Sequence, residues 1–331
     1  MEASLLIPIS PVYAKGADFS DDNYAPTVQA TLNQIDVMTR VKNAYPDQFS
    51  SSLTSRSALA SFYHHHSLIS PLGIEGLHQI GNSAATLRLY HALGVRYATL
   101  THNCPNIYAD SALAEHPFRI APPIHHGVSP KGRRLIREMN RVGMIVDLSH
   151  TSVETQLDVL GAGKDDWEGS VAPVIFSHSS VWNICPHPRN VKDEVLGRVK
   201  ERRGVVMINF SPDFISCKSK GEGELPEFDK ENATLDQVVR HVLYIGEKIG
   251  WDFVGLGSDF DGIESTPRGL EDVSKYPDLI AELLRKGVKD DDAKKLVGGN
   301  VLRVWREAER VAEELQRKGE PVLEDDLHSA W

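Results

Sequence analysis

Short apolar runs alternate with longer amphipathic stretches along this chain, and that alternation limits the folds open to it more than any other feature. Seven runs are too short for helices and are predicted to be buried strands: residues 5–9, 67–76, 95–102, 144–150, 172–178, 205–210 and 253–259. Helices are predicted at residues 24–44, 82–93, 129–141, 234–249, 276–285 and 290–316. Ser129 is expected to cap one of these helices and Gly143 to lie near its end. Alternating strands and helices favour a parallel sheet, in an α/β barrel or an open α/β fold.

Two of the predicted strands end in the same Ser-His pair. Ser149-His150 follows one apolar run, and Ser177-His178 follows the next. In parallel α/β folds, ligands and metals bind at the carboxyl ends of the strands. A single histidine is more often a surface or core residue, but two at matched strand ends favour a shared metal ion.

Four further polar residues stand at predicted strand ends: Glu75, His102, Asn209 and Asp259. Glutamate, histidine and aspartate form the ligand set expected of a hydrolytic zinc site, where a carboxylate can bridge two metals. An unligated histidine or aspartate could then orient the substrate or move protons. Taken alone, Asp259 and Asp261 could simply form a turn.

Other polar groups have plainer interpretations. The histidines at 64–66 and at 125–126 are expected in solvated loops, although such clusters resemble metal sites. Arg189, in the run Pro-His-Pro-Arg-Asn-Val, is either a surface cation or a fork that binds a carboxylate.

Charge and cysteine usage exclude several classes of protein. A formal net charge of -10 without a basic stripe argues against a nucleic-acid partner. No apolar run is long enough for a transmembrane segment, and the first residues do not read as a signal peptide, which predicts a cytoplasmic protein. Cys104, Cys185 and Cys217 lack CxxC spacing, so buried thiols are expected rather than a zinc ribbon or a redox pair.

The polar strand ends belong to longer motifs: GIEG at 73–76, LTHNC at 100–104, DLSH at 147–150, PVIFSHSS at 173–180, RNV at 189–191, GSDFDG at 257–262 and RGLEDVSKYP at 268–277. These motifs resemble the membrane (renal) dipeptidase family of zinc peptidases, over nearly the whole chain. The resemblance implies a (β/α)₈ TIM barrel of the metal-dependent hydrolase type, with two zinc ions at its carboxyl end. Glu75 would bridge both metals, and His150 and His178 would complete the second zinc. The implied reaction is hydrolysis of the peptide bond of a dipeptide by a metal-bound hydroxide.

The same resemblance implies roles for residues around the metals. His102 would hold the substrate carbonyl oxygen, and Arg189 would receive the terminal carboxylate of the dipeptide. Asp259 would contact the water or the free amine and pass a proton to the leaving amine. Cys185 and Cys217 match a pair that some secreted relatives join as a disulfide, but without a signal peptide free thiols are expected. A homodimer is a further expectation from the family.

One part of the family pattern is missing from this sequence. Family members carry a His-x-Asp pair at the end of their first strand, which supplies the remaining ligands of the first zinc. No His-x-Asp occurs in the chain, and the pattern would put it before Met1. Seven predicted strands are also one fewer than a closed barrel needs. We therefore expect a single barrel domain over residues 1–331 that lacks its first βα unit, with at most one well-liganded zinc site and a polar C-terminal extension at 319–331.

Three functional hypotheses stay open at this point. The first is a zinc dipeptidase that acts on general dipeptides or on the Cys-Gly unit of a thiol conjugate, with the missing strand encoded upstream. The second is a catalytically impaired or inactive dipeptidase-like protein that binds at most one zinc. The third is a mononuclear amidohydrolase that acts on a lactam or an acyl-amino acid.

Overall fold

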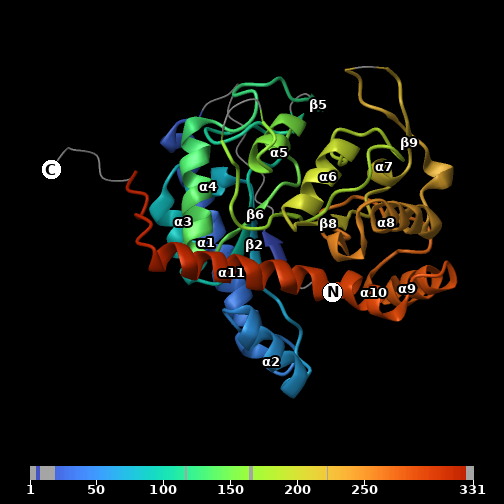
Figure 1. Ribbon diagram of the computed structural model, residues 1–331, viewed down its shortest axis with the longest axis horizontal. Coiled ribbons are helices and arrows are strands. Elements are labelled where there is room, and N and C mark those ends of the chain that lie inside the picture. Colours follow the sequence, from blue (N-terminus) through green and yellow to red (C-terminus); the bar gives the residue numbers. More distant parts are fainter. Residues whose placement is uncertain (1–4, 8–18, 116–117, 164–166, 222, 326–331) are drawn as a thin grey trace.

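The structure, a computed structural model, describes residues 5–7, 19–115, 118–163, 167–221 and 223–325. Its centre is a seven-stranded sheet in the order β1-β2-β3-β6-β7-β8-β11 (Figure 1). These strands are β1 Leu5–Ile7, β2 Leu72–Glu75, β3 Val95–Thr99, β6 Ile145–Asp147, β7 Ile175–Phe176, β8 Val205–Ile208 and β11 Val254–Leu256. All neighbouring pairs run parallel, which confirms the expected α/β fold. Residues 8 and 9 of the first predicted strand lie outside the described residues.

The strands end earlier than the apolar runs that predicted them. β6 stops at Asp147 and β7 at Phe176, so both Ser-His pairs lie in the loops that follow. β3 likewise stops at Thr99, before His102. The register places Glu75 opposite Thr99, and Thr99 opposite Asp147. β2, β3 and β6 therefore end side by side, and the loops that follow them lie together at the carboxyl edge of the sheet.

Helices surround the sheet and cross its lower end (Figure 1). They are α1 Asp21–Ala44, α2 Ser55–His65, α3 Ala84–Ala92, α4 Pro130–Val142, α5 Val153–Val159, α6 Asp193–Glu201, α7 Pro212–Ile215, α8 Leu235–Ile249, α9 Tyr276–Arg285, α10 Asp290–Lys294 and α11 Asn300–Arg317. Short 3₁₀ turns span Leu77–Ile80, Lys230–Asn232, Trp251–Phe253 and Val273–Lys275, and two small hairpins pair β4 Leu113–Ala114 with β5 Arg119–Ile120 and β9 Cys217–Lys218 with β10 Glu227–Phe228. Ser129 caps α4 and Gly143 ends it at a φ of 84°, as predicted. Within the described ranges, no helix combines the length and the apolar character needed to cross a membrane.

The single helix expected at residues 290–316 is wrong in its middle. α10 ends at Lys294, a π-type turn spans Lys295–Gly299, and α11 begins at Asn300. Gly298 has a φ of 147°, a backbone conformation that glycine adopts readily and other residues rarely do. The predicted helix is therefore two helices, and the second, α11, lies across the lower end of the sheet (Figure 1).

The loop expected around the three consecutive histidines is also partly wrong. His64 and His65 form the last turn of α2, and His66 ends that helix in the left-handed conformation. All three side chains are exposed, so their solvation is as expected. Residues 125–126 lie in a loop, as predicted.

α11 closes the lower end of the sheet. Its Trp305 and Ala308 pack in one buried cluster with Tyr97, Ile145 and Ile175 of the strands. A cavity of about 450 Å³ lies between the sheet and helices α2 and α11, lined by apolar side chains such as Met207 and Leu256 and reaching Ser177, His178 and Asp259. β1 and β11 are the two ends of the sheet in the described part of the chain.

The C-terminal segment, expected as a surface extension, is tied to the body as far as the structure describes it. The backbone N–H of Leu323 donates to Glu138 at 3.2 Å, and its carbonyl accepts from Arg88 at 2.9 Å. Glu138 is buried and also pairs with Arg141 at 2.7 Å. Residues 326–331 of the predicted extension lie outside the described residues.

Candidate metal centre

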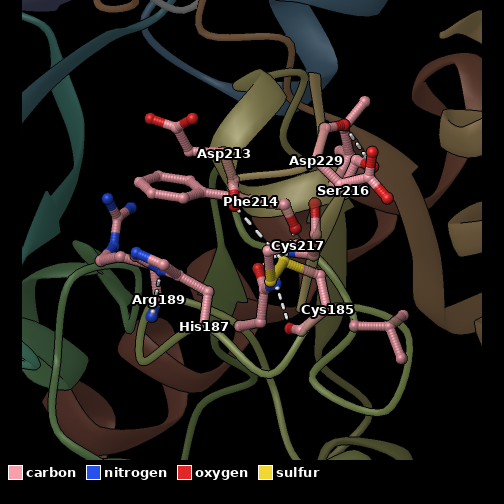
Figure 2. Close-up of a disulfide and its surroundings, with 12 residues drawn as sticks. Cys185, His187, Arg189, Asp213, Phe214, Ser216, Cys217 and Asp229 are labelled. Atoms are coloured by element: carbon pink, nitrogen blue, oxygen red, sulfur yellow. Dashed lines mark hydrogen bonds between the residues drawn. A yellow bond between two sulfur atoms is a disulfide. The ribbon is translucent and has the colours of Figure 1, made fainter. Parts of the chain in front are cut away.

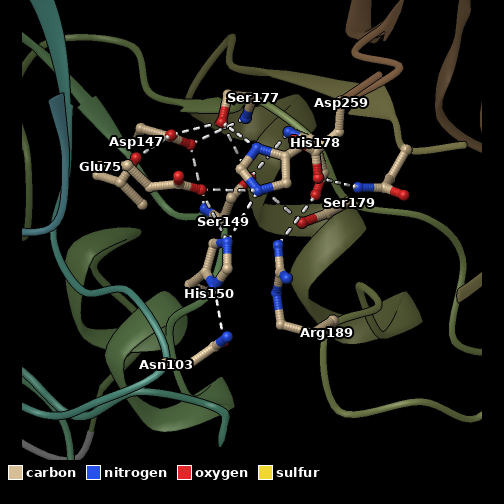
Figure 3. A network of polar contacts seen from close by, with 12 residues as sticks. Glu75, Asn103, Asp147, Ser149, His150, Ser177, His178, Ser179, Arg189 and Asp259 are labelled. Atoms are coloured by element: carbon tan, nitrogen blue, oxygen red, sulfur yellow. Dashed lines mark hydrogen bonds and ion pairs between the residues drawn. The ribbon is translucent and has the colours of Figure 1, made fainter. Parts of the chain in front are cut away.

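Glu75, His150 and His178 bring three ligand atoms to one point at the carboxyl edge of the sheet (Figure 3). Nε2 of His150 lies 2.9 Å from Oε1 of Glu75, and Nε2 of His178 lies 3.2 Å from the same oxygen. The two Nε2 atoms are 2.9 Å apart. All three residues are buried. The structure thus brings together three of the six residues that the strand-end pattern singled out, the three that the family resemblance implies as metal ligands.

Strand ends and the loops that follow them deliver these side chains. Glu75 is the last residue of β2, whereas His150 and His178 follow β6 and β7 at the first turn beyond each strand. His150 has a φ of 66°, in the left-handed region that residues other than glycine seldom occupy. Such strained backbone is concentrated at functional sites, where the surrounding structure holds it in place.

The hydrogen bonds of the imidazoles fit a cation between them. Nδ1 of His150 lies 2.9 Å from Oδ1 of Asn103, and Nδ1 of His178 lies 2.8 Å from Oγ of Ser177. An amide oxygen only accepts, so His150 donates from Nδ1 and turns an unprotonated Nε2 toward the other ligand atoms. A carboxylate oxygen and imidazole lone pairs at this separation repel each other unless a positive charge lies among them. Three N and O ligands with one position open match a catalytic zinc site.

Ionisation of Glu75 and a neutral His150 also suit a cation. Burial alone would raise the pKa of Glu75, but His102 and the hydrogen bonds from His150 and His178 hold that pKa well below its usual value. Burial keeps the pKa of His150 well below its usual value. Burial acts the same way on His178, but Asp259 and Glu75 outweigh it and raise the pKa of that imidazole. An ionised carboxylate therefore faces the two imidazoles.

His102 lies against this cluster, with its ring centroid 4.5 Å from that of His150. The residue follows β3 in a loop rather than ending the strand. Burial lowers the pKa of His102, while the charges of Glu75 and Glu115 act in the opposite direction. A neutral imidazole beside the three ligand atoms can donate a hydrogen bond to a bound oxygen.

Arg189 lies next to His178 (Figure 3). Its side chain is buried, which excludes the interpretation of Arg189 as a surface cation. Its Nη2 donates to the backbone oxygen of His178 at 3.3 Å, and its guanidinium lies over the ring of Phe214, 5.1 Å from the centroid. Burial lowers its pKa to about 10, so the side chain stays protonated at neutral pH. Among the described residues, none accepts from its buried Nε. A buried guanidinium with an unfilled donor suits an anionic ligand.

A disulfide joins Cys185 to Cys217 beside this arginine, so the expectation of free thiols is wrong (Figure 2). The two Cα atoms are 5.0 Å apart although 32 residues separate them in sequence. The fold brings the loop after β7, with Cys185, against the segment after α7, with Cys217. The spacing of the cysteines in the sequence does not reveal this contact. The bond holds the two segments that carry Arg189 and Phe214. Cys104 stays a thiol, and burial raises its pKa to about 12.

Asp259 follows β11 and turns toward His178 (Figure 3). Its φ is 65°, and its backbone oxygen accepts from Gly262 at 2.9 Å, so the expected turn is present. Asn209 donates from Nδ2 to Oδ2 of Asp259 at 3.2 Å. The strand-end asparagine therefore supports the aspartate instead of joining the three ligand atoms.

Sequence reasoning missed Asn103, Asp147 and Ser177 as parts of the site. All three stand next to or within the motifs around the predicted ligands, and that adjacency was the available signal. Their hydrogen bonds cross between loops that are distant in sequence, so no spacing rule reveals them.

Comparisons with known proteins agree on one family. The sequence model of the membrane dipeptidase family (peptidase family M19) matches residues 11–319. The chain is 46% identical over 315 residues to dipeptidase tcpJ of Claviceps purpurea, covering 95% of this chain and 68% of that protein. It is 48% identical over 301 residues to dipeptidase aclJ of Aspergillus oryzae, covering 91% of this chain and 65% of that protein. The chain therefore spans about two thirds of the length of these relatives.

Solved structures share the fold. The probable dipeptidase PvdM from Pseudomonas aeruginosa aligns with a TM-score of 0.75 at 23% identity, over 86% of this chain and 81% of that one. A family M19 metallopeptidase, dipeptidase AC, aligns with a TM-score of 0.71 at 26% identity, over 86% and 76% of the two chains. A metallopeptidase from Rhodobacter sphaeroides, liganded with a phosphinate mimic of the dipeptide L-Ala-D-Ala, aligns with a TM-score of 0.67 at 25% identity, over 82% and 72%.

Proposed function

Because the chain belongs to the membrane dipeptidase family, peptidase family M19, a family of dipeptide hydrolases, we propose that it hydrolyses the peptide bond of dipeptides at the site around Glu75, His150 and His178. The observation that carries the proposal is the convergence of these three buried ligand atoms beside a buried arginine. The substrate class includes the Cys-Gly units of thiol conjugates, which also present a free amine and a terminal carboxylate.

We propose zinc as the metal. Oε1 of Glu75 and Nε2 of His150 and His178 would hold it, a donor set that suits zinc. When bound, zinc supplies the Lewis acidity that activates water and polarises a carbonyl group.

Two charged residues would select the substrate. Arg189, buried and protonated, would bind the terminal carboxylate through its fork of N–H donors. Asp259 carries the opposite charge and lies beside the same histidine (Figure 3), where it would bind the free amine. A substrate with both charges next to a single peptide bond satisfies the two residues, whereas a longer peptide does not.

Two residues would assist the bond cleavage. His102 would donate a hydrogen bond to the carbonyl oxygen, where negative charge develops as water attacks. A carboxylate oxygen of Asp259 would accept a proton from the attacking water and deliver it to the leaving nitrogen.

The test is metal content together with hydrolysis of a defined panel. Elemental analysis of the purified chain should find zinc bound, and the Glu75→Gln variant should lose it. Free dipeptides, with an S-substituted Cys-Gly among them, should be cleaved, while N-acetylated or C-amidated dipeptides, tripeptides and a lactam should not.

Other outcomes distinguish the remaining hypotheses. Bound zinc with no hydrolysis of any dipeptide would contradict the proposed activity and favour a catalytically impaired protein. Cleavage of the lactam or the acylated amino acids in preference to dipeptides would contradict the proposed substrate class.

A further inference from the structure

Asp147 is a fully buried carboxylate at the end of β6, between the two loops that carry the histidines. Four neutral donors surround it. Its Oδ1 accepts from the backbone N–H of Ser149 at 3.1 Å and of Ser177 at 2.8 Å. Its Oδ2 accepts from the hydroxyls of Thr99 at 2.6 Å and Ser177 at 2.5 Å. A buried carboxylate requires such hydrogen bonds, and these arise from three different strands or their loops.

The hydroxyl of Ser177 connects this carboxylate to His178. Ser177 has one hydroxyl proton to donate. The carboxylate of Asp147 is the nearest acceptor, at 2.5 Å, and it is charged, whereas the neutral Oγ of Ser149 lies 3.3 Å away, so the proton goes to Asp147. With that proton engaged, Oγ of Ser177 can only accept from Nδ1 of His178, 2.8 Å distant. Nδ1 must therefore be protonated, so the neutral ring keeps the lone pair of Nε2 for the proposed metal.

The same carboxylate sets the position of both Ser-His loops. By accepting the backbone N–H groups of Ser149 and Ser177, Asp147 fixes the start of each loop. Ser149 then accepts the backbone N–H of His178 at 2.9 Å through its own hydroxyl, so the two loops interlock (Figure 3). The repeated serine is therefore part of the support of the site.

We propose that Asp147 is a positioning residue: through Ser177 it selects the tautomer of His178 that turns Nε2 toward Glu75, and through the two loops it holds both imidazoles in place. The proposal deepens the function proposed above, because it rests on the same metal site. Outer partners of metal-bound histidines commonly contribute 10- to 100-fold in metal affinity.

The decisive variant is Asp147→Asn. An asparagine amide donates to Ser177 where the carboxylate accepted, so the serine proton turns to Nδ1 of His178 and the ring takes the opposite tautomer. Nitrogen NMR of the metal-free, ¹⁵N-histidine-labelled full chain distinguishes a protonated from an unprotonated Nδ1. Ser177→Ala, which removes the connecting hydroxyl, should lower the fraction with Nδ1 protonated, and Ser177→Thr should restore it.

Zinc affinity gives a second measurement, by competition with a chromophoric chelator. Asp147→Asn and Ser177→Ala should each weaken zinc binding by about 10- to 100-fold. Thr99→Val is the matched control, because it removes a donor to the same carboxylate without contacting His178. It should keep the wild-type tautomer and an affinity within about threefold.

The outcomes separate this proposal from the proposed function. An unchanged Nδ1–H signal of His178 in folded Asp147→Asn would overturn the positioning role, even if zinc affinity fell. If that variant does not fold, an unchanged signal in Ser177→Ala overturns it equally. If His178 of the wild-type chain carries its proton on Nδ1 but the chain binds no zinc, the proposed function is contradicted. The selection of the tautomer by Asp147 then still stands.

Discussion

Single residues decide what the site can bind, and Arg189 is the clearest case. Its guanidinium is buried against Phe214 and presents a planar fork, which a lysine cannot reproduce. We expect Arg189→Lys to raise KM for a dipeptide by about 10- to 100-fold with a smaller change in kcat, measured by steady-state kinetics. The exposed Arg198→Lys is the control. A KM for free dipeptides that stays at the wild-type value in Arg189→Lys would contradict the assignment.

Asp259 is expected to act on the chemical step. Asp259→Asn keeps the size of the side chain but removes its capacity to accept a proton, so kcat should fall by about 10²- to 10⁴-fold. Zinc content should stay at the wild-type level, because Asp259 is not one of the three ligand residues. Asp261→Asn, two residues along and exposed, should behave like the wild type. Wild-type turnover by the Asp259 variant would exclude the proposed proton transfer.

At the residue scale, the sequence predicts the candidate metal ligands better than it predicts the residues that hold those ligands in place by hydrogen bonds. Glu75, His150 and His178 were found because each stands at the end of a predicted strand, and parallel strands bring their carboxyl ends together. The same rule suggested Asn209, which instead supports Asp259. Asp147, in contrast, acts through contacts between loops, and such contacts leave no periodic pattern in one sequence.

Among the larger elements, the disulfide holds the loop that carries the arginine. Replacing both Cys185 and Cys217 by alanine removes a cross-link across 32 residues, which should lower the free energy of unfolding by roughly 3–4 kcal/mol. Without the disulfide, the loop that carries Arg189 is held less firmly, so KM for a dipeptide should rise while the metal content stays constant. Urea unfolding and kinetics of the double variant measure both effects, with Cys104→Ala as the control. A double variant as stable as the wild type would show that the bond is absent from the protein in solution.

α8 is connected to its neighbours by a buried neutral histidine. His241 accepts from the backbone N–H of Val181 at 2.9 Å, and its Nε2 donates to the backbone oxygen of Ile215 at 2.9 Å. Burial lowers its pKa to about 4, below the unfolded value near 6.5. Between these values the unfolded chain binds a proton that the folded chain rejects, so stability should decline as pH falls from 6.5 toward 4.

The contribution of His241 to this decline is roughly 3 kcal/mol. The slope of unfolding free energy against pH, measured by urea unfolding, should be shallower in His241→Gln, whatever its absolute stability. The exposed His64→Gln should keep the wild-type slope. Identical slopes in all three proteins would refute this account.

The types of the strands and helices that were predicted are correct, but their ends are less accurate, and helices α5 and α6 were not among those predicted. The strands stop early because polar residues such as Asp147 and Ser149 bond across to other loops as soon as the sheet ends. The helix at 290–316 was predicted without a break because apolar spacing continues through it, and only the backbone conformation of Gly298 shows the interruption.

Across the whole molecule, metal binding should be linked to stability, because Glu75, His150 and His178 come from three separate strands. A ligand at about 1,000 times its Kd stabilises a folded protein by roughly 4 kcal/mol. Zinc added to metal-free protein should therefore raise the Tm by several degrees, and a chelator should reverse the shift. Glu75→Gln should abolish most of this response in a scanning calorimeter. A full response in that variant would mean that zinc stabilises the chain from another place.

The position of α11 has a consequence for biosynthesis. The strands pair with their neighbours in chain order, so the sheet can assemble progressively as the polypeptide emerges from the ribosome. Trp305 and Ala308, which cover the apolar floor of Tyr97, Ile145 and Ile175, are translated long after that floor. A nascent chain therefore carries this apolar surface uncovered between the synthesis of Ile175 and that of Trp305, and this interval is when chaperones would have the most to bind.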